Sequence, residues 1–283
     1  MMHQIAGIPA RIARQRPLVH MIPNSVTVSL CTDGLSAMGA RPLMAVAPEE
    51  MEEIPAYADA VVVNMGQPTA EKLRAAKTAL LTAQQHGVPI VWDPVGAGAS
   101  VFRRREFQRL LSLKWQGIVK GNESEIAALQ SGTVSHQGID SIGTFALNLH
   151  PKDGRVWAVS GKRDMVFDGR QCFYLQHEDE KKLMLTGSGC LTGAVMGACH
   201  AVEDDPVTAA LAAFFIMAYA GKKAAEQSGY GSQKQALLDA LTMIDGQEFT
   251  EYVCAAWERS GDGFPGLQPW SVAGAERKGR VEQ

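Results

Sequence analysis

The chain has 283 residues, with 27 Lys and Arg against 30 Asp and Glu, and 46% of its residues are hydrophobic. A net charge of −3 gives no positive field for non-specific binding of nucleic acid, and the apolar content is too high for a disordered chain. A chain of this length can bury a full core without disulfides, and its length predicts one or two domains.

Short apolar runs alternate with amphipathic segments through the first two-thirds of the chain. The expected strands are residues 18–22, 43–46, 60–64, 89–92, 117–119 and 156–159. The expected helices between them are residues 26–38, a helix opened by Pro48, and residues 68–86, 103–113 and 123–129. Strands separated by helices of this kind predict βαβ units and a parallel sheet covered on both faces.

The last third of the sequence changes character. Residues 165–167 and 171–175 flank Asp168-Gly169-Arg170 and predict a β-hairpin. Helices are expected after it, at residues 190–202, 206–228 and 234–244. Because no polar linker divides the chain, we predict one α/β domain over residues 1–257, with a flexible tail at residues 258–283.

Five cysteines are spread along the chain without a Cys-x-x-Cys pair, which favours a reducing cytoplasm over a disulfide framework. Residues 1–16 lack the apolar run of a signal peptide. Residues 183–202 carry no formal charge but include polar side chains and four glycines, and residues 206–221 are too short to span a bilayer. Both stretches are interpreted as buried helices, and we expect no membrane partner.

Polar residues gather where the expected strands end. In an open parallel sheet, ligands bind beyond the carboxyl ends of the strands. The residues at those ends include Asn24, Asn64, Asp93, Lys120 and Ser160. The ligand site is therefore expected at this edge of the sheet.

The turn Thr186-Gly187-Ser188-Gly189-Cys190 lies directly before an expected helix. Small residues let the backbone approach a ligand closely, and the free N–H groups of a helix start favour phosphate. The chain has neither the G-x-x-x-x-G-K-[ST] pattern of a P-loop nor a dinucleotide fingerprint in its first βα turn. The turn is thus a candidate phosphate site of another kind, although a Gly-x-Gly before a helix is a weak signal alone.

Two carboxylates, Asp93 and Glu125, lie near this candidate phosphate site and provide oxygen ligands suited to Mg²⁺, directly or through water. Each also has a simpler interpretation. Glu125 can stabilise a helix N-terminus, and Asp93 can form the turn before Pro94. The metal hypothesis gains weight only because the two occur together.

Two other features, Cys190 and Lys120, each allow two interpretations. Cys190 is either a small buried apolar residue or, at a helix N-terminus, a thiol whose pKa falls below about 8.5. Lys120 is either a surface cation or a partner of phosphate. The run Arg103-Arg104-Arg105 is interpreted as one solvated helix start.

In this order, the motifs resemble the hydroxyethylthiazole kinase family, a thiamine-salvage branch of the ribokinase-like fold. The resemblance runs from about residue 17 to about residue 244. The segments that carry it are Pro17-Leu-Val-His20, Asn24, Met38-Gly-Ala40, Pro42-Leu-Met44-Ala45, Ala47-Pro-Glu-Glu50, Val62-Val-Asn64-Met-Gly66, Asp93-Pro-Val-Gly-Ala-Gly98, Gly121-Asn122, Glu125-Ile126 and Thr186-Gly-Ser-Gly-Cys190.

The resemblance implies a three-layer α/β sandwich around a mostly parallel sheet. It also implies transfer of the ATP γ-phosphate, with Mg²⁺, to the primary alcohol of 4-methyl-5-(2-hydroxyethyl)thiazole. Similar enzymes are homotrimers with sites at subunit boundaries. Lys120 stands where the family usually has Arg, and Ser160-Gly-Lys162 stands where it usually has Thr-Gly-Glu.

The resemblance also implies roles for individual residues. Cys190 stands where related sugar and vitamin kinases place an Asp general base, so it is the candidate catalytic residue. The implied substrate contacts are Asn24, Met44 and Gly187; the implied ATP contacts are Lys120, Ser160 and Gly189; the implied metal ligands are Asp93 and Glu125.

Three alternatives remain open. The chain is a related kinase of another small alcohol or vitamin, a kinase-like protein that binds ligand without turnover, or a nucleotide-dependent dehydratase on the same fold. Retention of Asp93, Glu125 and the glycine turn favours a working kinase.

Overall fold

The computed structural model describes residues 1–131, 154–176 and 185–259. Residues 183 and 184 of the uncharged stretch lie outside the described residues. So does the expected tail, apart from Glu258 and Arg259, which end the last helix.

The described strands form an eight-stranded sheet in the order β2-β1-β3-β4-β5-β6-β7-β8. The pairs from β2 to β6 are parallel, and β6, β7 and β8 are joined antiparallel. The strands are β1 (Leu18–Ile22), β2 (Arg41–Leu43), β3 (Ala60–Asn64), β4 (Ile90–Asp93), β5 (Ile118–Asn122), β6 (Val156–Ser160), β7 (Arg163–Phe167) and β8 (Cys172–Gln176).

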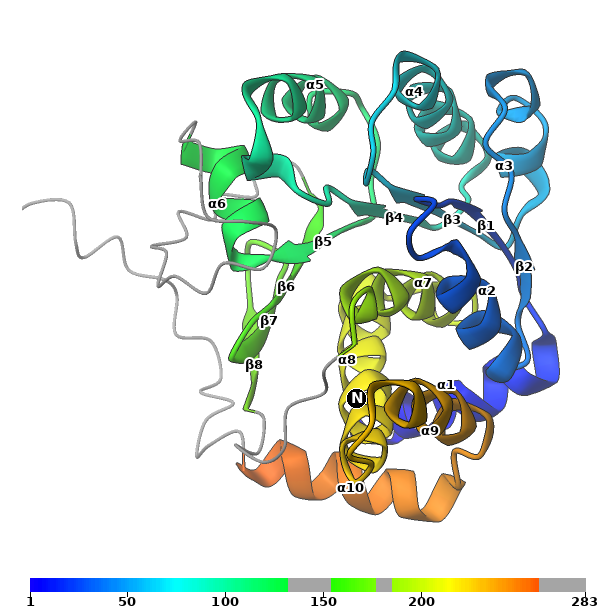
Figure 1. Cartoon of the computed structure of the whole chain (residues 1–283), viewed down its shortest axis with the longest axis vertical. Helices are drawn as coiled ribbons and strands as arrows, with labels where there is room; N and C mark the ends of the chain where they lie inside the picture. The colour runs from blue at the N-terminus through cyan, green and yellow to red at the C-terminus, as the bar shows by residue number, and fades with distance from the viewer. Residues whose placement is uncertain (132–153, 177–184, 260–283) are drawn as a thin grey trace, which may run out of the picture.

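Helices cover the two faces of this sheet and make three layers (Figure 1). On one face lie α3 (Ile54–Tyr57), α4 (Ala70–His86), α5 (Val101–Leu111) and α6 (Glu123–Ser131). On the other lie α1 (Met2–Gln15), α2 (Val28–Ala37), α7 (Ser188–His200), α8 (Pro206–Ala225), α9 (Tyr230–Thr242) and α10 (Gly246–Arg259). Short 3₁₀ turns occur at Pro48–Glu50 and Ala97–Ala99. The predicted three-layer α/β class is confirmed.

Each strand contributes to both cores because its side chains alternate between the faces. Val61 and Val63 of β3 join the apolar cluster under α4 and α5, whereas Val62 joins the cluster under α7 and α8. All five residues of β3 are buried. This two-sided burial explains the near-continuous apolar strands of the sequence.

Helix α7 packs directly on the centre of the sheet. A Cβ atom added at Gly197 would lie 2.3 Å from Val62 Cγ2, so a larger residue there would push the helix away from β3. The absence of a side chain at Gly197 therefore sets the distance between α7 and the strands. It places the start of this helix close to the strand ends.

Four local differences from the sequence prediction have physical reasons. Helix α1 was not expected, yet its Ile5, Ile8 and Ile12 are fully buried at helical spacing. Helix α10 was likewise not expected; it packs against α1, and its Phe249 and Val253 are fully buried. The edge strand lies at 41–43 rather than 43–46 because Arg41, Pro42 and Leu43 pair with β1, and an edge strand tolerates proline.

The fourth difference concerns α8, which ends at Ala225 rather than at the expected residue 228. In the described part of the chain it is the one helix long and apolar enough to cross a membrane by length and composition, and 78% of its most apolar window is buried in the protein. Two lysines, Lys222 and Lys223, continue the helix beyond the apolar run. Its packing is that of a core helix, as expected.

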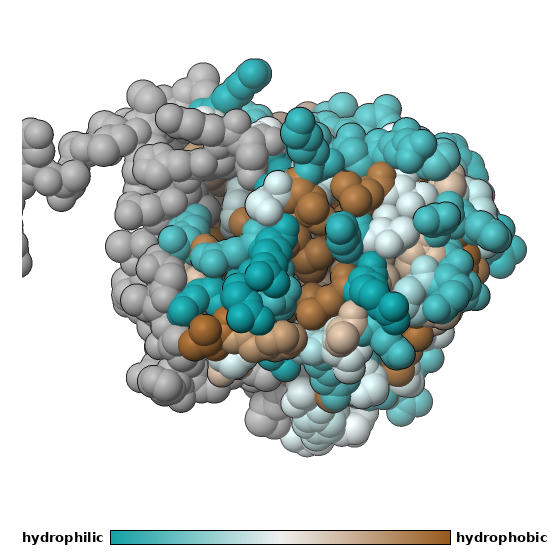
Figure 2. All heavy atoms as spheres, turned by 90° about the horizontal axis from the view of Figure 1, so that it is seen from above, coloured by the Kyte–Doolittle hydropathy of each residue, from teal (hydrophilic) through white to brown (hydrophobic). Residues whose placement is uncertain are grey.

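Figure 2 shows the molecule from above the view of Figure 1, over the helix layer that carries α4 and α5. Apolar side chains (brown) form a strip between hydrophilic ones on this face. Leu81 of α4 and Val101 and Phe102 of α5 are large apolar residues that remain exposed. The outer face of this layer is therefore not uniformly polar.

Candidate active site

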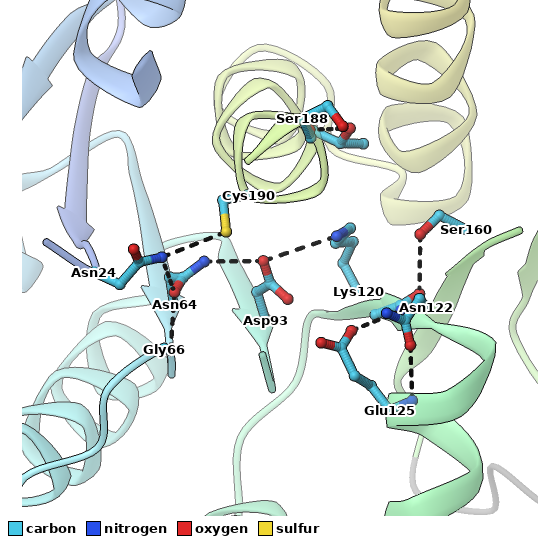
Figure 3. A network of polar contacts seen from close by, with 12 residues as sticks. Asn24, Asn64, Gly66, Asp93, Lys120, Asn122, Glu125, Ser160, Ser188 and Cys190 are labelled. Carbon is cyan, nitrogen blue, oxygen red and sulfur yellow. Dashed lines mark hydrogen bonds and ion pairs between the residues drawn. The ribbon is translucent and has the colours of Figure 1, made fainter. Parts of the chain in front are cut away.

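The strand ends and the start of α7 meet at one edge of the sheet (Figure 3). Polar side chains reach this edge from neighbouring strands or the loops after them, and Cys190 lies over them in the first turn of α7. The strand-side residues are Asn24, Asn64, Asp93, Lys120, Asn122 and Ser160. The structure therefore brings most of the predicted site residues together.

Asn24, in the loop after β1, has an amide whose orientation is set by its partners. Its Oδ1 accepts the backbone N–H groups of Val26 and Thr27 at 3.0 and 3.1 Å. The Nδ2 group must then point the other way, where it donates to Asn64 Oδ1 at 3.0 Å and to Cys190 Sγ at 3.4 Å. Asn24 therefore joins the start of α2 to the candidate catalytic thiol.

Asn64, the last residue of β3, continues this network toward the carboxylates. Its Oδ1 accepts from Asn24 and from the backbone N–H of Gly66, so its Nδ2 donates to Asp93 Oδ2 at 3.0 Å. The side chain is fully buried. The sequence marked Asn64 as a strand-end residue but gave it no role, because its function depends on partners from three separate segments.

Asp93, at the end of β4, is paired with Lys120 of β5. Lys120 Nζ lies 3.8 Å from Asp93 Oδ2, and both side chains are almost completely buried. Burial raises the pKa of Asp93, and the nearby Glu125 carboxylate raises it further. Although burial alone would lower the pKa of Lys120, the charges of Asp93 and Glu125 raise it. Lys120 is thus a buried counter-ion rather than a surface cation.

The carboxylates of Asp93 and Glu125 provide the oxygen atoms that could hold Mg²⁺. Asp93 Oδ1 is buried and has no hydrogen-bond partner among the described residues, so it offers an acceptor directed at the site. Glu125 is held by backbone amides: Oε1 accepts from Gly96 at 2.7 Å and Oε2 from Asn122 at 2.8 Å.

Across the described residues, no group of three or more His, Cys, Asp or Glu residues forms a complete metal cage. Mg²⁺ commonly uses one or two carboxylates, substrate phosphates and several waters instead of an all-protein cage. Asp93 and Glu125 fit that mode of binding.

Of the two interpretations of Cys190, the structure supports the buried residue and contradicts the thiol with a lowered pKa. A helix N-terminus was expected to lower its pKa, but in the structure the pKa is raised, first by burial and next by the carboxylate of Asp93. Lys120 opposes this shift without reversing it. A thiol with a raised pKa keeps its proton at neutral pH and serves as a hydrogen-bonding group.

The glycine turn begins α7 with a left-handed residue. Gly187 has φ +91°, and a Cβ atom there would lie 2.5 Å from Thr27 Cγ2, so a side chain is excluded by conformation and by space. Gly189 lies against Lys120, whose Nζ would be 3.3 Å from an added Cβ. The first N–H groups of a helix have no partner within it. The Ser188 N–H donates to the Leu185 carbonyl at 3.4 Å, so the N–H groups of Gly189 and Cys190 are the ones suited to an anion beside the Lys120 cation.

Two predicted residues lie toward the margins of this network. Ser160 ends β6, pairs with Asn122 across the sheet and donates through Oγ to the Gly121 carbonyl at 3.5 Å. Met44 follows the edge strand β2 and is half-buried, packed against the core cluster on the α7 side of the sheet. Among the described residues, no hydrogen bond links Met44 to the network, so its substrate role stays a prediction.

Two cations near the site were not predicted. Lys72, in the first turn of α4, donates to the carbonyls of Pro23 and Gly66. Arg103 donates to the Val95 carbonyl at 2.9 Å, and partial burial lowers its pKa. The prediction of one solvated Arg run is therefore wrong for Arg103, because α5 turns that side chain toward the loop after β4.

The family model for the hydroxyethylthiazole kinase family matches residues 10–247. A hydroxyethylthiazole kinase from Methanocella arvoryzae is 37% identical over 251 residues, covering 86% of this chain and 94% of that relative. One from Moorella thermoacetica is 37% identical over 257 residues, covering 88% of this chain and 96% of the relative.

Solved structures agree with this similarity. The structure of a hydroxyethylthiazole kinase protein from Pyrococcus horikoshii OT3 matches with a TM-score of 0.76 at 37% identity, covering 85% of this chain and 93% of that chain. A ribokinase-like superfamily protein from Enterococcus faecalis matches with a TM-score of 0.59 at 14% identity, covering 85% of this chain and 89% of that chain. At this low identity the match supports the fold alone. From the family match and the identity to its relatives, the chain belongs to the hydroxyethylthiazole kinase family.

Proposed function

We propose that this protein transfers the γ-phosphate of ATP to the primary alcohol of 4-methyl-5-(2-hydroxyethyl)thiazole. The observation that carries the proposal is the position of Cys190 and the glycine turn of α7 over the Asp93–Lys120 pair. Relatives that are 37% identical are hydroxyethylthiazole kinases, which supports this choice of acceptor.

In this proposal the phosphates lie between the start of α7 and the strand ends. The N–H groups of Gly189 and Cys190 and the Lys120 ammonium neutralise charge on the transferred group. Asp93, with Glu125 beside it, would hold Mg²⁺, which neutralises charge on the phosphates when bound. Ser160 lies at the end of β6, where it contacts ATP.

The acceptor alcohol lies beside Cys190 and Asn24. Its oxygen forms a bond to the γ-phosphorus while the bond to the β–γ bridging oxygen breaks, giving the alcohol phosphate and ADP. Because the transition state of phosphoryl transfer is loose, the alcohol loses its proton late, to an oxygen of the transferred phosphoryl group, and needs alignment more than a strong base. A protonated Cys190 thiol, held by Asn24, fits that positioning role.

The proposal includes a cytoplasmic homotrimer with sites at subunit boundaries. All five cysteines are free, which suits a reducing compartment. Val26 and Val46 are 69% and 51% exposed, and each lies two residues after a predicted substrate contact, Asn24 or Met44. Covering these apolar side chains with a neighbouring subunit would stabilise the assembly and close the site.

The test is a panel of small alcohols assayed for ATP-dependent phosphorylation. The panel contains the thiazole alcohol, its analogue without the hydroxyl, pyridoxal, a hydroxymethylpyrimidine and ribose, with ADP and the product mass both measured. The proposal expects Mg²⁺-dependent product from the thiazole alcohol and none from its deoxy analogue. Phosphorylation of another alcohol alone would identify a related kinase, and binding without product would identify a non-catalytic homologue.

The metal role is tested with Asp93→Ala and the isosteric Asp93→Asn. Loss of a metal or transition-state contact should lower turnover by roughly 10²-fold or more. Glu106→Gln, on the outer side of α5 and paired with Arg105 and Arg109, is the matched control and should leave turnover unchanged. An unchanged rate in Asp93→Asn excludes the proposed role of Asp93.

A further inference from the structure

The ammonium group of Lys72 connects two loops of the site. It donates to the carbonyl oxygen of Pro23 and to that of Gly66, both at 2.6 Å. Pro23 directly precedes Asn24 in the loop after β1, and Gly66 lies two residues after Asn64 in the loop after β3. One side chain thus holds the backbone on both sides of the Asn24–Asn64 hydrogen bond.

The two loops touch closely at this point. A Cβ atom added at Gly66 would lie 2.8 Å from Asn24 Cβ, so the loops pack backbone against side chain. A second connection joins them further out, where Gln67 Oε1 accepts from the backbone N–H and the hydroxyl of Ser25 at 3.1 and 2.7 Å. Lys72 supplies the partly buried connection, whereas the connection between Gln67 and Ser25 is exposed.

The position of Lys72 in α4 does not stabilise that helix electrostatically. Its backbone N–H donates to the N-cap Thr69, which places it in the first turn, where the helix dipole disfavours a cation. Among the described residues, no carboxylate lies within 4.0 Å of its Nζ. The pKa of Lys72 is lowered to about 8, chiefly by burial; Arg103 adds to the lowering, whereas Cys190 and Asp93 oppose it.

We propose that Lys72 is a positioning residue for the phosphoryl acceptor. By holding the loop after β1 against the loop after β3, it keeps the Asn24 amide directed at Cys190 and Asn64. An error of about an ångström in such a group is enough to lower the rate greatly. This role rests on the proposed function, because the acceptor alcohol is placed beside Asn24 and Cys190.

The test compares Lys72→Met with Lys72→Arg, which can still donate to two carbonyls. Lys77→Met, an exposed lysine on the same helix, is the matched control. The first readout is hydrogen exchange of the amides of residues 24–27 in the absence of substrate. We expect exchange to be about tenfold or more faster in Lys72→Met, close to wild type in Lys72→Arg, and unchanged in Lys77→Met.

The second readout is steady-state kinetics with the thiazole alcohol and ATP. Lys72→Met should raise the KM for the alcohol about tenfold or more while the KM for ATP changes less than twofold, and Lys72→Arg should recover most of the loss. Unchanged exchange in Lys72→Met overturns the inference, and so does faster exchange with an unchanged KM for the alcohol.

The failure of the inference is distinct from that of the proposed function. If wild-type protein phosphorylates no thiazole alcohol, the proposed function fails, and with it the assignment of the acceptor to this loop, whatever the exchange data show. If wild type is active and Lys72→Met behaves like Lys77→Met, only the Lys72 inference fails. Should Lys72→Met not fold, Lys72→Gln and Lys72→Arg carry the same comparisons.

Discussion

Asn64 and Asp93 lie directly opposite each other on the adjacent parallel strands β3 and β4, and Asn64 Nδ2 donates to Asp93 Oδ2 at 3.0 Å. This bond turns one carboxylate oxygen toward the sheet network. The other, Oδ1, is left buried and without a hydrogen-bond partner in the described part of the chain. The amide therefore orients the carboxylate that is proposed to face the nucleotide.

Asn64→Leu removes this donor and also the acceptor used by Asn24 and Gly66. Each buried polar group left without a partner costs about 1–3 kcal/mol, so we expect the free energy of unfolding in urea to fall by at least that amount. The initial rate of alcohol phosphorylation should fall as well. Gln85→Leu removes an exposed amide from α4 and should change neither quantity. A full rate in Asn64→Leu would show that the network does not position Asp93.

The raised pKa of Cys190 predicts that its thiol reacts slowly with alkylating reagents, because the thiolate is the reactive form. At pH 7.5, alkylation of Cys190 by iodoacetamide should be slower than that of the half-exposed Cys254, as measured by peptide mass spectrometry. In Asp93→Asn the carboxylate that raises the thiol pKa is neutralised while Lys120 remains, so the pKa falls and alkylation becomes faster. Equal rates in wild type and Asp93→Asn would exclude this electrostatic coupling.

His200, the last residue of α7, predicts a pH dependence of stability. It is buried beside the Glu203 carbonyl, at 2.9 Å, and burial lowers its pKa below 6.5. Below pH 6.5 the unfolded chain binds a proton that the folded state resists, so His200 destabilises the protein as pH falls toward its folded pKa. At pH 8 both states are neutral, and this contribution is absent.

The measurement is the free energy of unfolding at pH 5 and pH 8. In His200→Gln the decrease between these values should be smaller than in wild type. Gln85→Leu, at an exposed and non-titrating position of α4, is the control and should keep the wild-type decrease. If His200→Gln also keeps it, the pKa of His200 is not lowered in the folded state.

Two glycines on helices predict opposite effects of the same substitution. Gly197→Ala places a Cβ 2.3 Å from Val62 Cγ2 and should destabilise the protein by about 1–3 kcal/mol through overpacking. A Cβ at Gly7 in α1 meets no atom within 4 Å, so Gly7→Ala should stabilise by roughly 0.5–1 kcal/mol. Thermal unfolding of both variants checks the signs. If Gly197→Ala unfolds at the wild-type temperature, the contact between α7 and β3 at Gly197 is not as close as the structure shows.

The local pattern of apolar residues and glycines predicted the positions of several strands and helix ends. The β1 and β3 runs begin and end where their apolar sequence predicted, and Gly87 ends α4 in the left-handed conformation expected of a helix-terminal glycine. These features depend on neighbours within a few residues. Helix α1 shows the limit of that approach, because its three isoleucines only became a recognisable core face once α8 and α10 were packed against it.

The motifs and the apolar pattern also predicted the family, the parallel sheet and the residues at the strand ends. The electrostatics of these residues followed only from the contacts between distant segments. Cys190 has a raised rather than a lowered pKa because burial and Asp93 outweigh the helix terminus. Lys72 and Asn64 acquire their roles from loops and strands distant in sequence. A pKa or an amide orientation depends on the charges and donors of several segments together, and these are known only after the segments have been brought into contact.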